Sequence, residues 1–289
     1  MVWRVFPLMN RDAGSIPPSA LTGAGAPSNG GTDPTPAGMA PLDLRGASTR
    51  ALPGVHAMAG IVVDAESGQV LWARKPHAKR PVASLTKLMT SLLAERRGGL
   101  RREITITDQM SNGLGYTIGL RPGDKKSVRD LLAATMIASA NDAANALAVY
   151  RSGSGSRFVS LMNVEAKKLG LSDTRYSNPS GIIDTGNHSS AWDVADLSRL
   201  YLTRPVLARL VRMKLYRPAA GASFVSRNRL LWDEPTAIGI KTGSTDLSGK
   251  CLAAAARQGR RTLIVVVLDA RGDEFAQAQT LLRWGFRQP

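Results

Sequence analysis

The stretch Pro81-Val82-Ala83-Ser84-Leu85-Thr86-Lys87-Leu88-Met89-Thr90 contains the pattern Ser-x-x-Lys at the start of an apolar periodicity. Leucine and methionine recur at helical spacing, which predicts a helix that begins at or just before Ser84 and runs to about Glu95. Ser84 and Lys87 would then share one face of that helix. A partly buried lysine that loses its proton there can accept the proton of the hydroxyl. Alone, the pattern also fits a serine helix cap followed by an exposed lysine.

Two later motifs favour the catalytic interpretation. Ser139-Ala140-Asn141 interrupts an apolar helical run, and Lys241-Thr242-Gly243 follows the strand-like Ala237–Ile240. Ser-x-x-Lys, a Ser-x-Asn element and Lys-Thr-Gly, in this order, form the signature of penicillin-binding proteins and class A β-lactamases. Each motif is short, but the three together in helix, loop and strand contexts are specific.

Composition excludes some classes of function. The 289 residues are 43% hydrophobic, which supports a packed core, and the net charge of +16 favours contact with an anionic surface. Aromatic residues make up only 5%, and no basic run is interleaved with them, so we expect no nucleic-acid partner. The single cysteine, Cys251, allows no internal disulfide and is expected in the core. No apolar run is long enough for a transmembrane helix.

The N-terminal part differs in composition from the rest. Residues 10–54 are rich in Gly, Ala, Pro, Ser and Thr, so we predict a disordered or processed leader over 1–54. Residues 1–9 make a poor secretory signal, with one arginine and Pro7 in the apolar patch. A misplaced start codon would explain this. We expect one catalytic domain over 55–289, without a C-terminal β-rich domain.

The remaining pattern predicts an α+β fold. A hairpin is expected at residues 59–73, with Gly68 in its turn, and strands at 222–225, 237–244, 251–257 and 262–268. Helices are expected between them, at 131–137, 142–150, 157–169 and 191–202, with a closing helix over 273–284. Ser127 and Asp130 resemble a capping box. We therefore predict an antiparallel sheet flanked by helices, with a mostly helical subdomain at about 105–215.

Several segments are similar to those of one family. They are Ala83–Thr90, Arg121–Asp124, Ala140–Ala143, His188–Ala191, Arg227–Asp233, Gly239–Gly243 and Leu282–Phe286. Over residues 56–288 the chain resembles the low-molecular-mass penicillin-binding proteins, in particular the serine-type D-Ala-D-Ala carboxypeptidases. The resemblance implies a β-lactamase-like fold and removal of the terminal D-Ala from peptidoglycan stem peptides. It also implies covalent inhibition by penicillins and other β-lactams.

The resemblance also implies roles for individual residues. Ser84 would be the nucleophile and Lys87 its base; Ser139 would pass a proton to the departing D-Ala; and Asn141 would orient Lys87 and hold the substrate amide. The backbone N–H groups of Ser84 and Ser244 would form the oxyanion hole. The remaining residues would bind the substrate: Lys241, Thr242 and Arg227 through the terminal carboxylate, and Gly243 by letting the substrate lie along the strand. No metal or cofactor is required.

Ser244 stands where related carboxypeptidases often carry His, so an altered rate or specificity is expected. Because peptidoglycan matures outside the cytoplasmic membrane, we expect export to the periplasm or cell envelope, with a basic surface available for electrostatic contact.

Three alternatives remain. A class A β-lactamase needs a Glu-x-x-Leu-Asn motif, which is absent between Asn141 and Lys241. A peptidoglycan endopeptidase would share every catalytic residue. A basic, non-catalytic wall-binding protein would not need both lysines.

Overall fold

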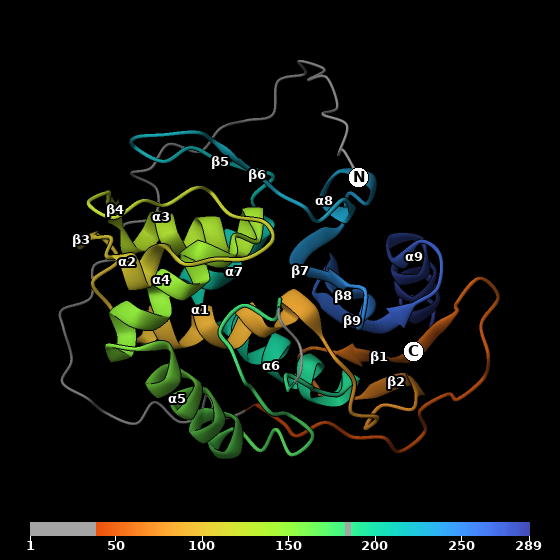
Figure 1. The fold of residues 1–289 in the computed structure, drawn as a ribbon. Helices are drawn as coiled ribbons and strands as arrows, with labels where there is room; N and C mark the ends of the chain where they lie inside the picture. The colour runs from red at the N-terminus through yellow and green to blue at the C-terminus, as the bar shows by residue number, and fades with distance from the viewer. Residues whose placement is uncertain (1–38, 183–185) are drawn as a thin grey trace.

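The core of the fold is a five-stranded antiparallel sheet with the strand order β2-β1-β9-β8-β7. The structure, a computed structural model, describes residues 39–182 and 186–289. Strand β7 lies at one edge of this sheet and ends beside the helices (Figure 1). The strands are β1 (Ala57–Asp64), β2 (Val70–Arg74), β7 (Ala237–Thr245), β8 (Gly249–Gln258) and β9 (Arg261–Ala270).

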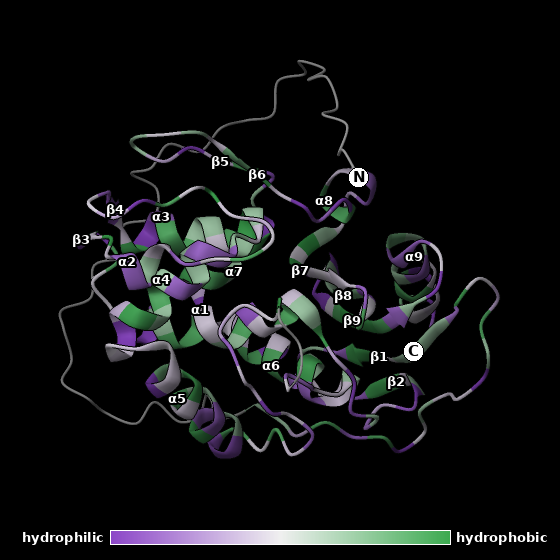
Figure 2. Ribbon diagram, viewed as in Figure 1, coloured by the Kyte–Doolittle hydropathy of each residue, from purple (hydrophilic) through white to green (hydrophobic). Residues whose placement is uncertain are grey.

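Alternating side chains of the sheet supply two separate cores. In β9, Ile264, Val266 and Leu268 join the core beneath α1 (Lys87–Arg96) and α6 (Ala191–Thr203). Leu263, Val265 and Val267 point to the other face and pack with α9 (Glu274–Gly285). This alternation follows from the two-residue period of a strand, and it explains why a strand covered on both faces is continuously apolar. Figure 2 shows β1 and β2 mainly in the green of apolar residues.

A third core fills the helical region beside the sheet. Ile104, Leu132, Leu147 and Leu210 are buried there, far from the sheet in sequence. The remaining strands and α-helices are β3 (Glu103–Thr105), α2 (Asp108–Ser111), β4 (Lys125–Ser127), α3 (Val128–Ala133), α4 (Asn141–Ser152), α5 (Gly155–Lys168), α7 (Pro205–Arg212), β5 (Leu215–Tyr216), β6 (Phe224–Val225) and α8 (Leu230–Asp233). The chain is therefore an α+β protein with an antiparallel sheet flanked by helices, as predicted.

The N-cap half of the predicted capping box is confirmed at the start of α3. The Asp130 N–H donates to Ser127 Oγ at 3.0 Å, and the Ser127 hydroxyl donates to the Asp130 carboxylate at 2.7 Å. The same carboxylate accepts a hydrogen bond from the Tyr216 hydroxyl at 2.7 Å. A substitution of Asp130 would therefore leave the Ser127 hydroxyl and the buried Tyr216 phenol without their acceptor.

The chain is ordered earlier than the composition suggested. Residues 39–54, which we expected in a disordered leader, run alongside β2, and Asp43 and Ser48 form bridges to Gln69 and Trp72. The buried guanidinium of Arg199 donates to the Ala40 carbonyl oxygen at 2.8 Å. Specific hydrogen bonds therefore hold a segment that has few apolar residues. Residues 1–38 of the predicted leader lie outside the described residues.

Other differences concern element boundaries. The helix predicted at 131–137 is α3 followed by a π-helical turn over Ala134–Ala138, and the strand predicted at 222–225 is only two residues long. The helices α7 and α8 were not predicted. Across residues 39–182 and 186–289, no helix combines the length and apolarity that crossing a bilayer requires.

Candidate active site

Ser84 lies in a turn that precedes a helix, rather than at the helix start that the sequence predicted. Residues Ala83–Thr86 form a 3₁₀ turn, and α1 begins only at Lys87. Ser84 Oγ makes no capping hydrogen bond; it lies 2.7 Å from Lys87 Nζ. The three-residue spacing therefore brings the two groups together, as predicted, although the local geometry is a tighter helix.

Two glycines allow neighbouring segments to approach this turn closely. A Cβ on Gly243 would lie 2.9 Å from the Ser84 backbone nitrogen, and a Cβ on Gly181 would lie 1.9 Å from the Ala83 carbonyl oxygen. Gly181 also has a φ of +78°, in the region that favours glycine. The turn is thus held between β7 and the loop that contains Gly181. Gly243 leaves room for the Ser84 turn.

Lys87 is completely buried and lies among oxygen atoms without a carboxylate partner. Its Nζ is 2.6 Å from Asn141 Oδ1 and 2.7 Å from the Ser180 carbonyl oxygen, in addition to the Ser84 contact. Burial lowers the pKa of Lys87 well below its usual value, and the positive charges of Lys241 and Arg227 lower it further. The environment therefore favours a neutral amine next to the serine hydroxyl.

The two other oxygens around Lys87 are fixed by their own neighbours. Asn141 Nδ2 donates to the Leu114 carbonyl oxygen at 2.5 Å, which turns Oδ1 toward the lysine. The Ser180 carbonyl belongs to a turn in which Asn178 Oδ1 accepts the N–H of Gly181 at 2.6 Å. Both acceptors are therefore held in place before any substrate binds.

Ser139 and Lys241 form a second pair. Ser139 follows the π-helical turn with a φ of +63°, and its Oγ accepts a hydrogen bond from Lys241 Nζ at 2.8 Å. Lys241 also donates to the Thr242 carbonyl oxygen at 3.0 Å. Burial, with a smaller effect from Arg227, lowers the pKa of Lys241 to about 7. This amine is therefore close to half protonated at neutral pH.

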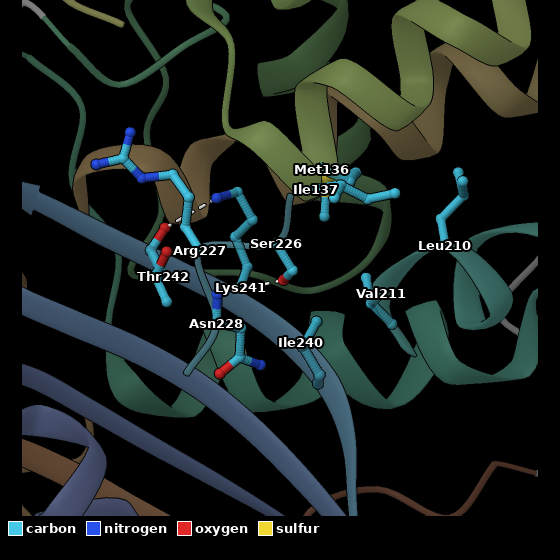
Figure 3. Close-up of a pocket in the computed structure, with 10 residues that line it drawn as sticks. All are labelled: Met136, Ile137, Leu210, Val211, Ser226, Arg227, Asn228, Ile240, Lys241 and Thr242. Atoms are coloured by element: carbon cyan, nitrogen blue, oxygen red, sulfur yellow. Dashed lines mark hydrogen bonds between the residues drawn. The ribbon is translucent and has the colours of Figure 1, made fainter. Parts of the chain in front are cut away.

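Arg227 lies on the same side of β7 as this second pair. Arg227, Lys241 and Thr242 line one narrow pocket together (Figure 3). The Arg227 guanidinium carbon lies 4.9 Å from the centre of the Tyr116 ring, a cation–π distance. Two cationic residues and a threonine thus lie near one another, a combination of residues that suits the binding of a carboxylate.

The predicted residues therefore form one site with two halves. Ser84, Lys87 and Asn141 are linked by hydrogen bonds, as are Ser139 and Lys241. Ser244 follows Gly243 on the edge strand β7, and its side chain is exposed. Within residues 39–182 and 186–289, this side chain makes no hydrogen bond with another site residue.

Sequence reasoning missed the backbone groups of the site. The carbonyl groups of Ser180, Leu114 and Tyr116 all accept hydrogen bonds from Lys87 or Asn141. Asp142 was quoted only as part of a motif, yet it is buried and accepts the N–H groups of Ile118 and Leu120, which fixes the loop over the site. The sequence Asn178-Pro179-Ser180-Gly181 indicates a turn, but it does not indicate that the Ser180 carbonyl group points toward Lys87.

The structure also bears on the β-lactamase alternative. Glu165 is buried and forms an ion pair with Arg96, on α5, where its carboxylate is committed to holding two helices together. It is therefore not placed to activate a water at Ser84.

Known proteins resemble this chain in sequence and in fold. A family model described as D-alanyl-D-alanine carboxypeptidase, Peptidase_S11, matches residues 46–272. The chain belongs to this family. It is 38% identical over 250 residues to the D-alanyl-D-alanine carboxypeptidase DacD of Escherichia coli, a match that covers 81% of this chain and 64% of DacD. The family member described here therefore spans just under two thirds of that relative's length.

Other relatives cover more of their own length. A Pseudomonas aeruginosa D-alanyl-D-alanine endopeptidase is 32% identical over 234 residues, which cover 78% of this chain and 75% of the relative. The crystal structure of a D-alanyl-D-alanine carboxypeptidase from Mycobacterium tuberculosis superposes with a TM-score of 0.79 at 30% identity, over 84% of this chain and 96% of that one. Penicillin-binding protein D2 of Listeria monocytogenes, in a cefotaxime-bound form, gives 0.74 at 30% identity, over 82% and 100%.

Proposed function

We propose that this chain is a serine-type D-Ala-D-Ala carboxypeptidase that removes the terminal D-Ala from peptidoglycan stem peptides through an acyl-enzyme on Ser84. The observation that carries the proposal is the distance of 2.7 Å between Ser84 Oγ and Lys87 Nζ, in surroundings that lower the lysine pKa. Family membership supports the same chemistry.

The hydrogen bonds around Lys87 give the direction of proton transfer. A neutral amine has two N–H donors and one lone pair, whereas Asn141 Oδ1 and the Ser180 carbonyl oxygen are acceptors only. These two oxygens take both N–H groups, so the lone pair faces Ser84 Oγ. The serine hydroxyl then donates its proton to Lys87 as its oxygen attacks the carbonyl carbon of the penultimate D-Ala.

The developing negative charge on the substrate oxygen is stabilised by backbone donors. The N–H groups of Ser84 and Ser244 are assigned to this oxyanion hole. The close approach of Gly243 to the Ser84 nitrogen supports the assignment, because it brings the end of β7 beside the nucleophile turn. Alternate N–H groups of an edge strand point away from the sheet, where a substrate can reach them.

The second half of the site serves the leaving group. When the C–N bond breaks, the Ser139 hydroxyl protonates the departing D-Ala nitrogen and is reprotonated by Lys241, whose Nζ already donates to it. Arg227, Thr242 and the Lys241 charge hold the terminal carboxylate. Exchange with solvent then removes the proton that Lys87 gained and restores the one that Lys241 lost. Water attacks the ester and gives a proton to Lys87, which passes it to the Ser84 oxygen as that oxygen leaves.

The same acylation step makes the chain a target for β-lactams. A β-lactam presents a carbonyl and a carboxylate at a comparable separation to the substrate. The Listeria penicillin-binding protein D2, solved in cefotaxime-bound and ampicillin-bound forms, supports this expectation. The endopeptidase activity named for the Pseudomonas relative is the second candidate, because it needs the same catalytic groups. Product analysis on monomeric and cross-linked muropeptides separates the two.

The substrate also sets where the protein must act. Peptidoglycan stem peptides are trimmed outside the cytoplasmic membrane, so we place the protein in the periplasm or cell envelope. The net charge of +16 supports electrostatic contact with anionic envelope polymers.

Intact-mass spectrometry after incubation with penicillin tests the proposal directly. We expect a slowly decaying adduct of one penicillin on the wild type and none on Ser84→Ala. Folded wild-type protein without an adduct would contradict the catalytic assignment and favour a wall-binding role. Complete penicillin turnover without an accumulating adduct would instead indicate a β-lactamase.

A further inference from the structure

Three arginines gather around one tyrosine at a surface that the mechanism above does not use. The guanidinium carbons of Arg97 and Arg102 lie 4.8 Å and 5.9 Å from the centre of the Tyr150 ring. Arg97 also donates to the Arg151 carbonyl oxygen at 3.1 Å, which brings the third arginine beside them. The residues Arg97, Arg102 and Arg151, called here the arginine cluster, thus come from three separate segments of the chain.

The arginine cluster lies at the opposite end of two helices from the catalytic groups. Helix α1 begins at Lys87 and α4 begins at Asn141, and these two side chains are 2.6 Å apart. At the other ends, Arg97 directly follows α1 and Arg151 is in the last turn of α4. The two helices pack against each other (Figure 1). Because the ten residues of α1 span about 15 Å, a ligand on the cluster leaves the active site accessible.

No carboxylate of the described chain balances the charge of the cluster. Glu95 and Glu165 are paired with other arginines. Glu103 follows the cluster in the sequence, but in the part of the chain that the structure describes it forms no ion pair with these guanidinium groups. Arg151 Nε is buried and has no hydrogen-bond partner among the described residues. Burial, followed by the positive charge of Arg97, lowers the pKa of Arg151 from its ordinary value.

The helix ends account for only part of this arrangement. Positive side chains are favoured at the C-terminal end of a helix, where the last carbonyl groups carry a partial negative charge. This explains Arg97 and Arg151. Arg102 is different, because it is exposed, directly precedes β3 and still lies against the same ring. Like charges that meet without a counter-charge repel one another, so an external anion would relieve the repulsion.

The geometry of the donors favours one class of anion. Guanidinium groups bind oxyanions through paired N–H donors. Donors that approach from three segments suit a tetrahedral phosphate, whose oxygens point in several directions, better than a planar carboxylate. None of the large apolar side chains exposed on the described surface belongs to residues 97–102 or 150–152. This surface therefore offers charge, but little that would insert into a bilayer.

We propose that the arginine cluster binds the phosphodiester groups of an anionic envelope polymer. Arg102 and Arg151 pair with the phosphate oxygens, and Arg97, which is held by its hydrogen bond to α4, adds to the positive charge. The polymer then holds the protein at the end of α1 and α4 that is remote from Ser84. The proposal rests on the proposed place of the protein in the cell envelope, and it assigns to three residues a contact that the net charge alone does not locate.

Binding of a fluorescently labelled, synthetic poly(glycerol phosphate) chain tests the assignment. Arg102→Gln together with Arg151→Gln removes two charges and keeps Arg97 in place. The dissociation constant from fluorescence anisotropy should rise by about tenfold or more, the effect of losing one or more hydrogen bonds between charged groups. The matched control, Arg260→Gln together with Arg283→Gln, removes two exposed charges near the sheet. It should change the constant by about twofold or less, because salt screens distant exposed charges.

Two further ligands separate the sources of negative charge. Poly-L-glutamate with the same number of charges carries carboxylates, and vesicles of phosphatidylglycerol and phosphatidylcholine carry phosphates on a bilayer. The wild type should bind poly(glycerol phosphate) more tightly than either. Equal affinity for poly-L-glutamate would overturn the assignment to phosphate. Tighter binding to the vesicles that is lost in the Arg102 and Arg151 double variant would replace the polymer with a membrane surface.

The enzymatic activity is measured on the same proteins, so that the two proposals can fail separately. Both double variants should form the penicillin adduct and hydrolyse a soluble D-Ala-D-Ala peptide at the wild-type rate. An unchanged dissociation constant in the cluster variant, or an equal rise in the control variant, would overturn the arginine cluster as the binding site and leave the enzyme in place. A wild type that binds the polymer through the cluster but forms no adduct would contradict the proposed catalytic function alone.

Discussion

Two buried lysines, Lys87 and Lys241, lie in the two halves of the candidate active site, although 154 positions separate them in the sequence. Lys87 Nζ is surrounded by three oxygens, on Ser84, Asn141 and Ser180. Lys241 Nζ has two, on Ser139 and Thr242. Neither amine has a carboxylate partner among the described residues. Burial and neighbouring positive charges therefore lower the pKa of both lysines.

The difference between the two lies in how strongly the ammonium form is disfavoured. The pKa of Lys87 is lowered well below its usual value, and two cations, Lys241 and Arg227, contribute to the shift. The pKa of Lys241 is lowered to about 7, with Arg227 as the added charge. In the proposed mechanism, one residue type would thus act as a base in one half of the site and as a proton donor and anion-binding group in the other.

The largest expected effect comes from removing the base. Lys87→Met keeps an unbranched side chain but has no lone pair for the Ser84 proton, so acylation by penicillin should slow by about 10²- to 10⁴-fold. Stopped-flow or mass-spectrometric adduct formation measures this rate. The matched change Lys241→Met should reduce adduct formation less and chiefly raise the substrate KM. Similar losses in both variants would contradict the division of roles.

A further variant isolates protonation from size. Lys87→Arg places a group that stays charged at every accessible pH where the mechanism needs a neutral one. It should be as inactive as Lys87→Met across the pH range. Recovery of acylation at high pH in this variant would show that neutrality at residue 87 is not the requirement.

The second prediction concerns the pH dependence that Lys241 imposes. The free enzyme loses the Lys241 ammonium as pH rises through about 7, and with it part of the attraction for the terminal carboxylate and the proton source for Ser139. The value of kcat/KM should therefore fall above pH 7, by up to about tenfold per pH unit. A pH profile on a D-Ala-D-Ala peptide measures the falling limb.

Lys241→Arg is the control for that limb. Arginine keeps its charge far above neutrality, so the decline near pH 7 should disappear even if the overall rate is lower. If the decline persists unchanged, another group titrates there and the assignment of the limb to Lys241 is wrong.

The sequence predicted much of the fold because its strands and helices follow regular apolar periods. Leu263–Leu268 is continuously apolar and forms the buried strand β9, and the hairpin around Gly68 forms as expected. The segment 39–54 was misjudged because hydrogen bonds, such as the one from Arg199 to the Ala40 carbonyl, hold it in place of apolar burial. Composition does not record such long-range contacts.

The sequence predicts the part of the site that side chains form, but not the part that backbone groups form. The contacts of Ser84 with Lys87 and of Ser139 with Lys241 could be expected from motif order, and the structure places these groups together. The Ser180 and Leu114 carbonyl groups could not be expected, because a backbone oxygen carries no residue-specific signal. The role of Gly243 likewise depends on which segment approaches it, and this is the Ser84 turn.

Tyr116 offers the smallest and most discriminating test, because it touches both halves of the site. Its backbone carbonyl accepts the Asn141 N–H at 2.9 Å, next to Lys87, while its ring faces the Arg227 guanidinium on the Lys241 side. Tyr116→Ala removes only the second contact. A cation–π contact at an exposed position is worth about 0.5–1 kcal/mol, so KM should rise about two- to fivefold with kcat unchanged. Tyr116→Phe keeps the ring and should restore the wild-type KM. A fall in kcat in Tyr116→Ala would mean that the two lysine sites are coupled through this side chain rather than separately tuned.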